Sequence, residues 1–104
     1  MKRLKVVIPP SVQEQIRDQL LYIAEDSIDN ALAWEDRLRA SINGIGNMHG
    51  HAIDEAASAR LGETIRKCVF EKTYLIHYRV NTAAGTVEIV NFRHGSRLPR
   101  TAEP

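Results

Sequence analysis

Apolar residues recur every three or four positions in two successive stretches of the first half of the chain. Over residues 11–25 they are Val12, Ile16, Leu20 and Ile23, and over 29–45 they are Ala31, Trp34, Leu38, Ile42 and Ile45. This spacing predicts two amphipathic helices. Only a few residues separate the two stretches, so we expect the helices to run antiparallel as a hairpin.

Capping signals support both helices. Ser11 followed three residues later by Glu14 fits a capping box at the start of the first helix. Ser27 or Asp29 provides a start for the second, and Gly44 and Gly46 mark its end.

The remaining apolar pattern is typical of strands. Residues 2–8 form a short β-branched run that Pro9 and Pro10 stop, and three further runs cover 64–70, 72–81 and 86–93. A tight turn at Glu71-Lys72 and a loop at 82–85 that ends in glycine join the last three runs as hairpins. Between helices and strands, residues 54–59 are compatible with a single helical turn.

This order predicts an α+β fold, a two-layer sandwich made of a strand, two helices and a three-stranded antiparallel meander. We expect the first strand to join the sheet beside the meander, and both helices to pack on one face. The length of 104 residues suits a single domain over residues 1–104.

Composition narrows the function classes. The net charge is only +1, with 14 basic and 13 acidic residues, which argues against a general polyanion-binding protein. The charge is uneven, because residues 60–104 carry an excess of about four positive charges. The lone cysteine, Cys68, lies in an apolar strand pattern and is expected in the core. No segment is long and apolar enough for a signal peptide or membrane span, so we expect a cytoplasmic protein.

His49 and His51 raise the question of a metal site. Two imidazoles need at least a third ligand, and no cysteine or acid is placed to provide one. We therefore interpret them as exposed loop histidines and expect neither a metal nor a cofactor. A phosphate-binding glycine loop and a serine nucleophile motif are also absent from the sequence.

A group of basic and imidazole side chains at the end of the chain is the main candidate site. Alternation along 72–81 puts Tyr74, Ile76, Tyr78 and Val80 on the core face, which directs His77 and Arg79 outward. Arg93, His94 and Arg97 follow at the end of the last strand. Arginines bind phosphates or carboxylates, and a histidine transfers protons near neutral pH. The alternative interpretation is a solvated sheet face.

The chain resembles the RelE/ParE superfamily of type II toxin–antitoxin toxins. The resemblance rests on the element order, on Tyr74–Val80 and Val87–Ile89, on the helical segments 22–25 and 33–38, and on the ending Arg93-His94-Gly95-Ser96-Arg97-Leu98-Pro99. That ending is similar to the His-Gly-x-Arg ending of ParE-like members.

The resemblance implies one of two targets. Ribosome-dependent mRNA endonucleases of the RelE type carry an arginine where this chain has Leu75, and several have a C-terminal tyrosine that it lacks. We therefore favour the ParE-like branch, which implies a plasmid-stabilisation toxin that inhibits DNA gyrase by binding it through His77, Arg79, Arg93, His94 and Arg97. The alternatives are an endonuclease that uses Arg79, Arg93 and His94, and a module that has lost its toxicity.

The resemblance also implies a cognate antitoxin. We expect its disordered segment to fold onto the helical hairpin and the sheet edge, near Ile16, Leu20, Trp34 and Leu38. DNA would then be contacted only through the antitoxin complex, and no membrane is involved.

Overall fold

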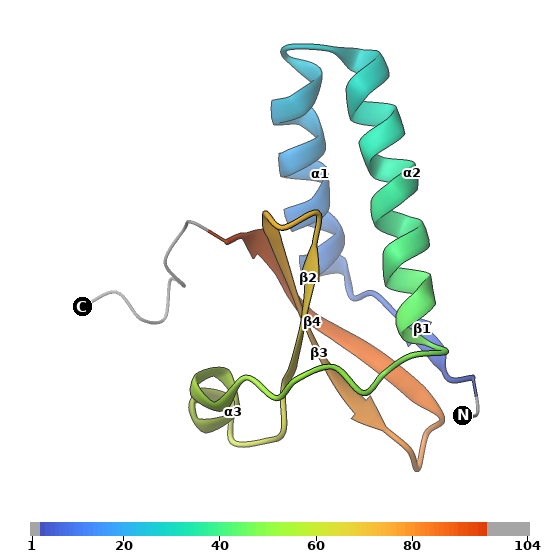
Figure 1. The fold of residues 1–104 in the computed structure, drawn as a ribbon, viewed down its shortest axis with the longest axis vertical. Helices are drawn as coiled ribbons and strands as arrows, with labels where there is room; N and C mark the ends of the chain where they lie inside the picture. The colour runs from blue at the N-terminus through green and yellow to red at the C-terminus, as the bar shows by residue number, and fades with distance from the viewer. Residues whose placement is uncertain (1–2, 96–104) are drawn as a thin grey trace.

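The computed structural model describes residues 3–95 as a four-stranded sheet, with a helical hairpin on one face and a short helix on the other (Figure 1). The elements follow in the order β1 (Lys5–Val7), α1 (Pro10–Ala24), α2 (Ile28–Ile45), α3 (Glu55–Leu61), β2 (Arg66–Phe70), β3 (Tyr74–Asn81) and β4 (Thr86–His94). The α+β class and the helical hairpin predicted from the sequence are confirmed.

The strands lie in the order β1-β4-β3-β2. β2, β3 and β4 pair antiparallel as a meander, and β1 pairs parallel with β4. The expected position of the first strand beside the meander is therefore correct. The β2–β3 turn is tight, with positive φ at Glu71 and Lys72. Two successive left-handed residues suit the right-handed twist of a hairpin.

The predicted capping box at Ser11 is wrong. Helix α1 begins one residue earlier, at Pro10, and Pro9 precedes it as an N-cap without a side-chain hydrogen bond. Proline is well suited to the first helical position, because its φ is already helical and its missing N–H would have had no partner. The carbonyl of Pro9 accepts from the N–H groups of Val12 and Gln13 instead.

Helix α2 begins and ends as its sequence suggests, but its terminal glycine serves a purpose the sequence did not reveal. Ser27 caps the start, its Oγ accepting from the Asn30 N–H at 3.1 Å. At the other end Gly46 has an ordinary helical φ of −58°. A Cβ at this position would lie 2.5 Å from the carbonyl oxygen of Leu4, whose N–H donates to the Gly46 carbonyl. Only glycine at position 46 therefore allows the chain before β1 to come this close to the end of α2.

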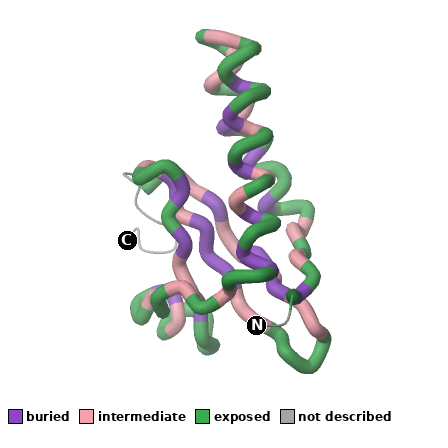
Figure 2. The backbone as a smooth tube through the Cα atoms, turned by 45° about the vertical axis from the view of Figure 1, so that its right-hand side comes forward, coloured by how far each residue is buried: buried purple, intermediate pink, exposed green. Residues whose placement is uncertain are grey.

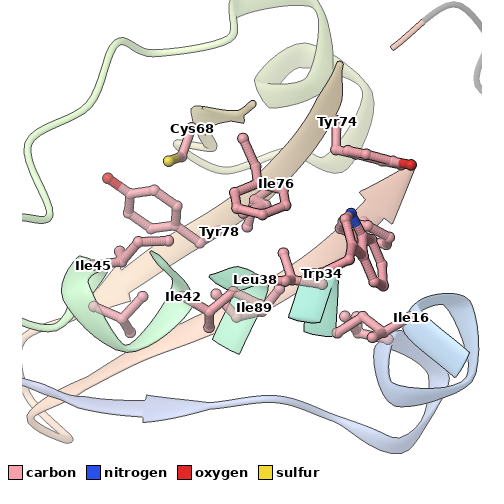
Figure 3. Close-up of a cluster of buried hydrophobic side chains, with 14 of the residues drawn as sticks. Ile16, Trp34, Leu38, Ile42, Ile45, Cys68, Tyr74, Ile76, Tyr78 and Ile89 are labelled. Carbon is pink, nitrogen blue, oxygen red and sulfur yellow. The ribbon is translucent and has the colours of Figure 1, made fainter. Parts of the chain in front are cut away.

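The hydrophobic core lies between the hairpin and the sheet (Figure 3). The helices contribute Val12, Ile16, Trp34, Leu38, Ile42 and Ile45, and the sheet contributes Cys68, Phe70, Tyr74, Ile76, Tyr78, Val87, Ile89 and Phe92. Trp34 packs against Phe70, Tyr74 and Phe92 with ring centroids 5.4–6.4 Å apart. The predicted core face of β3 is confirmed, and so is the buried position of Cys68.

A β-bulge in β4 changes which side chains reach the core. Tyr78 pairs with Ile89 and His77 pairs with Asn91, so Val90 is an extra residue in β4. An inserted residue reverses the alternation of the strand beyond it. Val87 and Ile89 face the core before the bulge, and Phe92 faces it afterwards.

Candidate functional site

The face of the sheet turned away from α1 and α2, here called the far face, carries most of the predicted site. Leu75, His77 and Arg79 of β3 alternate with the core residues, and α3 lies on this side (Figure 1). The sequence placed His77 and Arg79 on the correct face. It did not reveal that residues before β2 cover this face.

His77 is buried, and the prediction that it faces solvent is wrong. Its side chain is only 4% exposed. Its Nε2 lies 2.9 Å from Oδ2 of Asp54, and its Nδ1 lies 3.2 Å from the side-chain amide of Asn91. Both ring nitrogens are thus engaged inside the protein, which leaves His77 no direct contact with a target in this conformation.

The environment of His77 favours a neutral ring. Burial lowers the pKa of His77, the hydrogen bond to Asp54 opposes that shift, and the charges of Arg93 and Lys67 add to it. A neutral ring with its proton on Nε2 donates to Asp54 and accepts the Asn91 amide at Nδ1. The pKa of Asp54 is lowered, first by the backbone N–H of Ala57 and also by His77. Asp54 is the N-cap of α3. It therefore links the covering helix to the sheet.

Arg79 is held by two carboxylates. Its Nε donates to Glu88 at 2.8 Å and its Nη1 donates to Glu63 at 2.6 Å. These hydrogen bonds, that of Glu88 first, raise the pKa of Arg79. Two of the donors of Arg79 and much of its charge are thus engaged within the chain, and its role as an anion ligand stays a prediction.

Arg93 and His94 are neighbours in β4 and therefore point to opposite faces of the sheet, and the bulge at Val90 determines which of them faces the core. Arg93 pairs with Leu75, whose side chain lies on the far face, whereas His94 pairs with Tyr74 of the core face. The His94 ring contacts the Tyr74 ring at 5.4 Å between centroids. The expected single cluster is therefore divided between two faces. Arg97, the last member of the predicted group, lies outside the described residues.

The residues predicted to bind the antitoxin belong largely to the core. Ile16, Trp34 and Leu38 are each less than 5% exposed, and Leu20 is partly buried against the same cluster. They belong to the apolar stripes of the helices, and those stripes pack against this chain's own sheet. Three of the four are consequently inaccessible to a partner in this conformation.

His49 and His51 are not the exposed loop residues that the sequence suggested. Both are half-buried, and Nδ1 of His51 lies 2.8 Å from the hydroxyl of Tyr78. The carbonyl of His51 accepts from Arg66 at 2.6 Å. His51 thus fixes the loop before α3 to the sheet. Within residues 3–95 no group of three or more His, Cys, Asp or Glu side chains is arranged to hold a metal ion.

Sequence reasoning missed Asp54 and Glu63, which bring negative charge onto the far face. The only sequence signal was an aspartate before a short helical stretch, typical of an N-cap. No local pattern indicated which side chains of the sheet these carboxylates would meet.

Strand order, helical hairpin and three-stranded meander together are consistent with the RelE/ParE-like fold. The family model described as the ParE toxin of the type II toxin–antitoxin system parDE matches residues 6–99, and the chain belongs to this family. Membership implies a partner antitoxin. No curated protein matches the chain. No helix in the described part of the chain is long and apolar enough to cross a membrane.

Proposed function

We propose that this toxin arrests replication by binding DNA gyrase, without a chemical reaction of its own, and that the cognate antitoxin neutralises it. Membership of the ParE toxin family supports the proposal. The observation that carries the non-catalytic part is the separation of Arg79, Arg93 and His94, the three side chains on which the endonuclease alternative depends.

Cleavage of a phosphodiester by side chains needs a base, an acid and a charge stabiliser around one phosphate. Arg93 pairs with Leu75 of β3. Arg79 is four positions further along the same strand, which is a distance of roughly 13 Å. Arg79 therefore lies far from Arg93 and is engaged by carboxylates. His94 lies on the opposite face of β4 from Arg93. This arrangement supports a binding role rather than a catalytic one.

The contact surfaces are part of the same proposal. Arg93 and His94, with Arg97 beyond the described residues, remain candidates for contact with the target. For the antitoxin, partly buried Leu20 remains a candidate on the hairpin, and half-exposed Val69 is available on the edge strand β2. An edge strand and exposed apolar side chains suit a segment that folds as it binds.

The test is a supercoiling assay with purified gyrase, titrated with the toxin in the presence and absence of its antitoxin. The proposal predicts loss of supercoiling, or trapped cleaved DNA, that the antitoxin reverses. Full supercoiling at saturating toxin contradicts it.

A second assay examines the alternative. Messenger RNA is mapped after expression of the toxin without antitoxin, for the wild type and for His94→Ala. We expect no translation-dependent cleavage in either case. Cuts at ribosome-bound codons that disappear in His94→Ala would support the endonuclease instead.

A further inference from the structure

The end of β4 lies at an edge of the sheet. Among residues 3–95, β1 pairs with β4 only at Thr86–Glu88, so residues 89–94 have no strand on that side. This stretch contains the bulge at Val90, where the pairing with β3 is interrupted as well. From Val90 onward the strand is half-buried except at Phe92 (Figure 2). A strand end that follows a bulge at an open edge needs other contacts to fix its position.

Helix α1 provides such contacts through a row of hydrogen bonds, here called the relay. Oε1 of Gln15 accepts from the N–H of Phe92 at 3.0 Å, and its Nε2 donates to Oδ1 of Asn91 at 3.2 Å. Nδ2 of Asn91 lies 3.2 Å from Nδ1 of His77, whose Nε2 lies 2.9 Å from Oδ2 of Asp54. The relay therefore connects the edge of β4, through α1 and the far face, to the N-cap of α3.

The direction of every hydrogen bond in the relay is fixed from its backbone end. The N–H of Phe92 can only donate, so Gln15 turns its oxygen to it and its NH₂ group to Asn91. Asn91 in turn directs its own NH₂ group to Nδ1 of His77, which must then carry no proton. The ring proton is on Nε2, where the carboxylate of Asp54 accepts it. The complete relay consequently fits a neutral imidazole and no other form of the ring.

A charged ring would break the relay. It carries a proton on both nitrogens, so it cannot accept from Asn91. If the Asn91 amide turned over, Gln15 would have to turn as well, and its NH₂ group would face the N–H of Phe92. One hydrogen bond is lost in either case. The loss is smallest at Gln15, the exposed member of the relay, because water can replace its bonds there.

The charges that surround His77 come from three other elements. Asp54 precedes α3, Lys67 pairs with His77 from β2, and Arg93 lies on β4. Burial lowers the pKa of His77 most, Lys67 and Arg93 lower it further, and Asp54 opposes them. On β3 itself Arg79 shares the far face but is held by two carboxylates. At neutral pH the ring is therefore uncharged and the relay is intact.

We infer that Gln15 and Asn91 position the end of β4, and that they do so only while His77 is uncharged. The inference rests on the proposed function in one respect, because the positioned segment carries Arg93 and His94, the candidates for contact with gyrase. A charge on His77 releases this segment from α1 and weakens inhibition. The coupling itself is measured on the toxin alone, so its failure is separate from that of the proposed function.

The first test follows the His77 ring and the backbone amide of Phe92 by NMR between about pH 8 and pH 5. In the wild type the amide signal should shift with the same midpoint as the ring. In Asn91→Asp the new carboxylate accepts both from Gln15 and from a charged ring, so the ring should titrate at higher pH than in the wild type while the Phe92 amide stays unchanged. In Gln15→Ala the ring titrates, but the amide no longer follows it.

The second test compares Gln15→Ala with Gln13→Ala near neutral pH. Gln13 is an exposed residue of the same helix, and its side chain accepts from Arg39. We expect hydrogen exchange at the Phe92 amide to be roughly three- to tenfold faster in Gln15→Ala, the effect of one lost hydrogen bond. The amount of toxin needed for half-inhibition of supercoiling should rise by a similar factor. The Gln13→Ala control should match the wild type in both measurements.

The coupling is refuted if the Phe92 amide does not follow the ring in the wild type, follows it equally in Gln15→Ala, or exchanges alike in the two glutamine variants. If the wild type unfolds in acid before the ring titrates, the coupling is supported when Asn91→Asp remains folded at that pH and refuted when both unfold together. If the coupling holds but Gln15→Ala inhibits gyrase like Gln13→Ala, the role in target contact fails and the proposed function stands. A wild type that does not inhibit gyrase overturns the proposed function and the role in target contact, and leaves the coupling.

Discussion

Gly46 shows how one residue determines whether two elements can meet. A Cβ on Gly46 would lie 2.5 Å from the carbonyl oxygen of Leu4, whereas a Cβ on Gly44, two residues earlier in α2, would meet no heavy atom of another segment within 4 Å. We expect Gly46→Ala to lower the free energy of unfolding by about 1–3 kcal/mol through the forced clash. Gly44→Ala should raise it by about 0.5–1 kcal/mol, since alanine favours a helix. Urea unfolding measures both, and equal effects would contradict the close approach of Leu4.

The buried His77 predicts a loss of stability in mild acid. Because its pKa is lowered from 6.5 in the folded state, the unfolded chain binds a proton as the pH falls below about 6.5 while the folded chain does not. The contribution of His77 is therefore complete above that pH and is lost as the pH falls toward the folded pKa. The lowered pKa of Asp54 adds a second loss in stronger acid, below its ordinary value of 3.8.

We expect the melting temperature of the wild type to fall between pH 7 and pH 5. It should fall less for His77→Gln, which has no proton to bind in that range. If the melting temperature falls by the same amount in the wild type and the variant over this range, His77 is not buried as a neutral ring.

At the scale of elements, Asp54 joins α3 to the sheet by two hydrogen bonds. Its Oδ1 accepts from the Ala57 N–H and so caps the helix, and its Oδ2 accepts from Nε2 of His77. Asp54→Ala should lower the free energy of unfolding by about 1 kcal/mol through loss of the cap. It should lower it by about 1–3 kcal/mol more because the buried imidazole is left without its acceptor. The control Ser27→Ala removes only the N-cap of α2 and should lower the free energy of unfolding by about 1 kcal/mol.

Hydrogen exchange distinguishes these two changes. Asp54→Ala should speed exchange in α3 and leave the core strands protected until global unfolding. Unchanged protection of α3 would mean that its other contacts, such as the Ser58 hydroxyl with the backbone of Ile65, are sufficient.

The sequence predicted the long elements well because each carries its own periodicity. The hairpin stripes and the alternation of Tyr74, Ile76 and Tyr78 are local signals, and their residues are buried as expected except Leu20 and Ile23, which are partly buried. The position of Val90 as a bulge is set by its pairing with β3, a non-local property. Uninterrupted alternation from Val87 and Ile89 would turn Arg93 to the core face and His94 to the far face, the reverse of the observed arrangement.

The dependence on contacts between distant segments also explains why the sequence did not predict the arrangement of the candidate site. Residues 47–62 have weak periodicity, so nothing local indicated that they cover the far face and bury His77. The sequence predicts that the hairpin stripes cover the sheet and also receive the antitoxin, but residues buried against the sheet are not accessible to a partner.

At the scale of the whole molecule, the fold separates charge. The outer part of the α1–α2 hairpin, residues 18–36, contains six carboxylates and no basic side chain, whereas residues 60–104 carry an excess of four positive charges. A protein whose negative and positive charges lie in separate regions associates with a charged partner at a rate that depends on ionic strength. The rate of toxin–gyrase association should therefore fall as salt increases from about 50 to 200 mM, as stopped-flow fluorescence of Trp34 or a surface-binding assay would record. Association that is independent of salt would argue against electrostatic recognition.

The central claim is that the toxin acts on gyrase by binding alone. The most direct measurement titrates a fixed amount of active gyrase with toxin and follows supercoiling over time, with His94→Ala in parallel. Binding alone predicts inhibition that saturates once toxin matches the gyrase sites, does not deepen with time, is reversed by antitoxin and persists in His94→Ala. Uninhibited gyrase at excess toxin, or inactivation that continues to grow with time at substoichiometric toxin and is lost in His94→Ala, would contradict the claim.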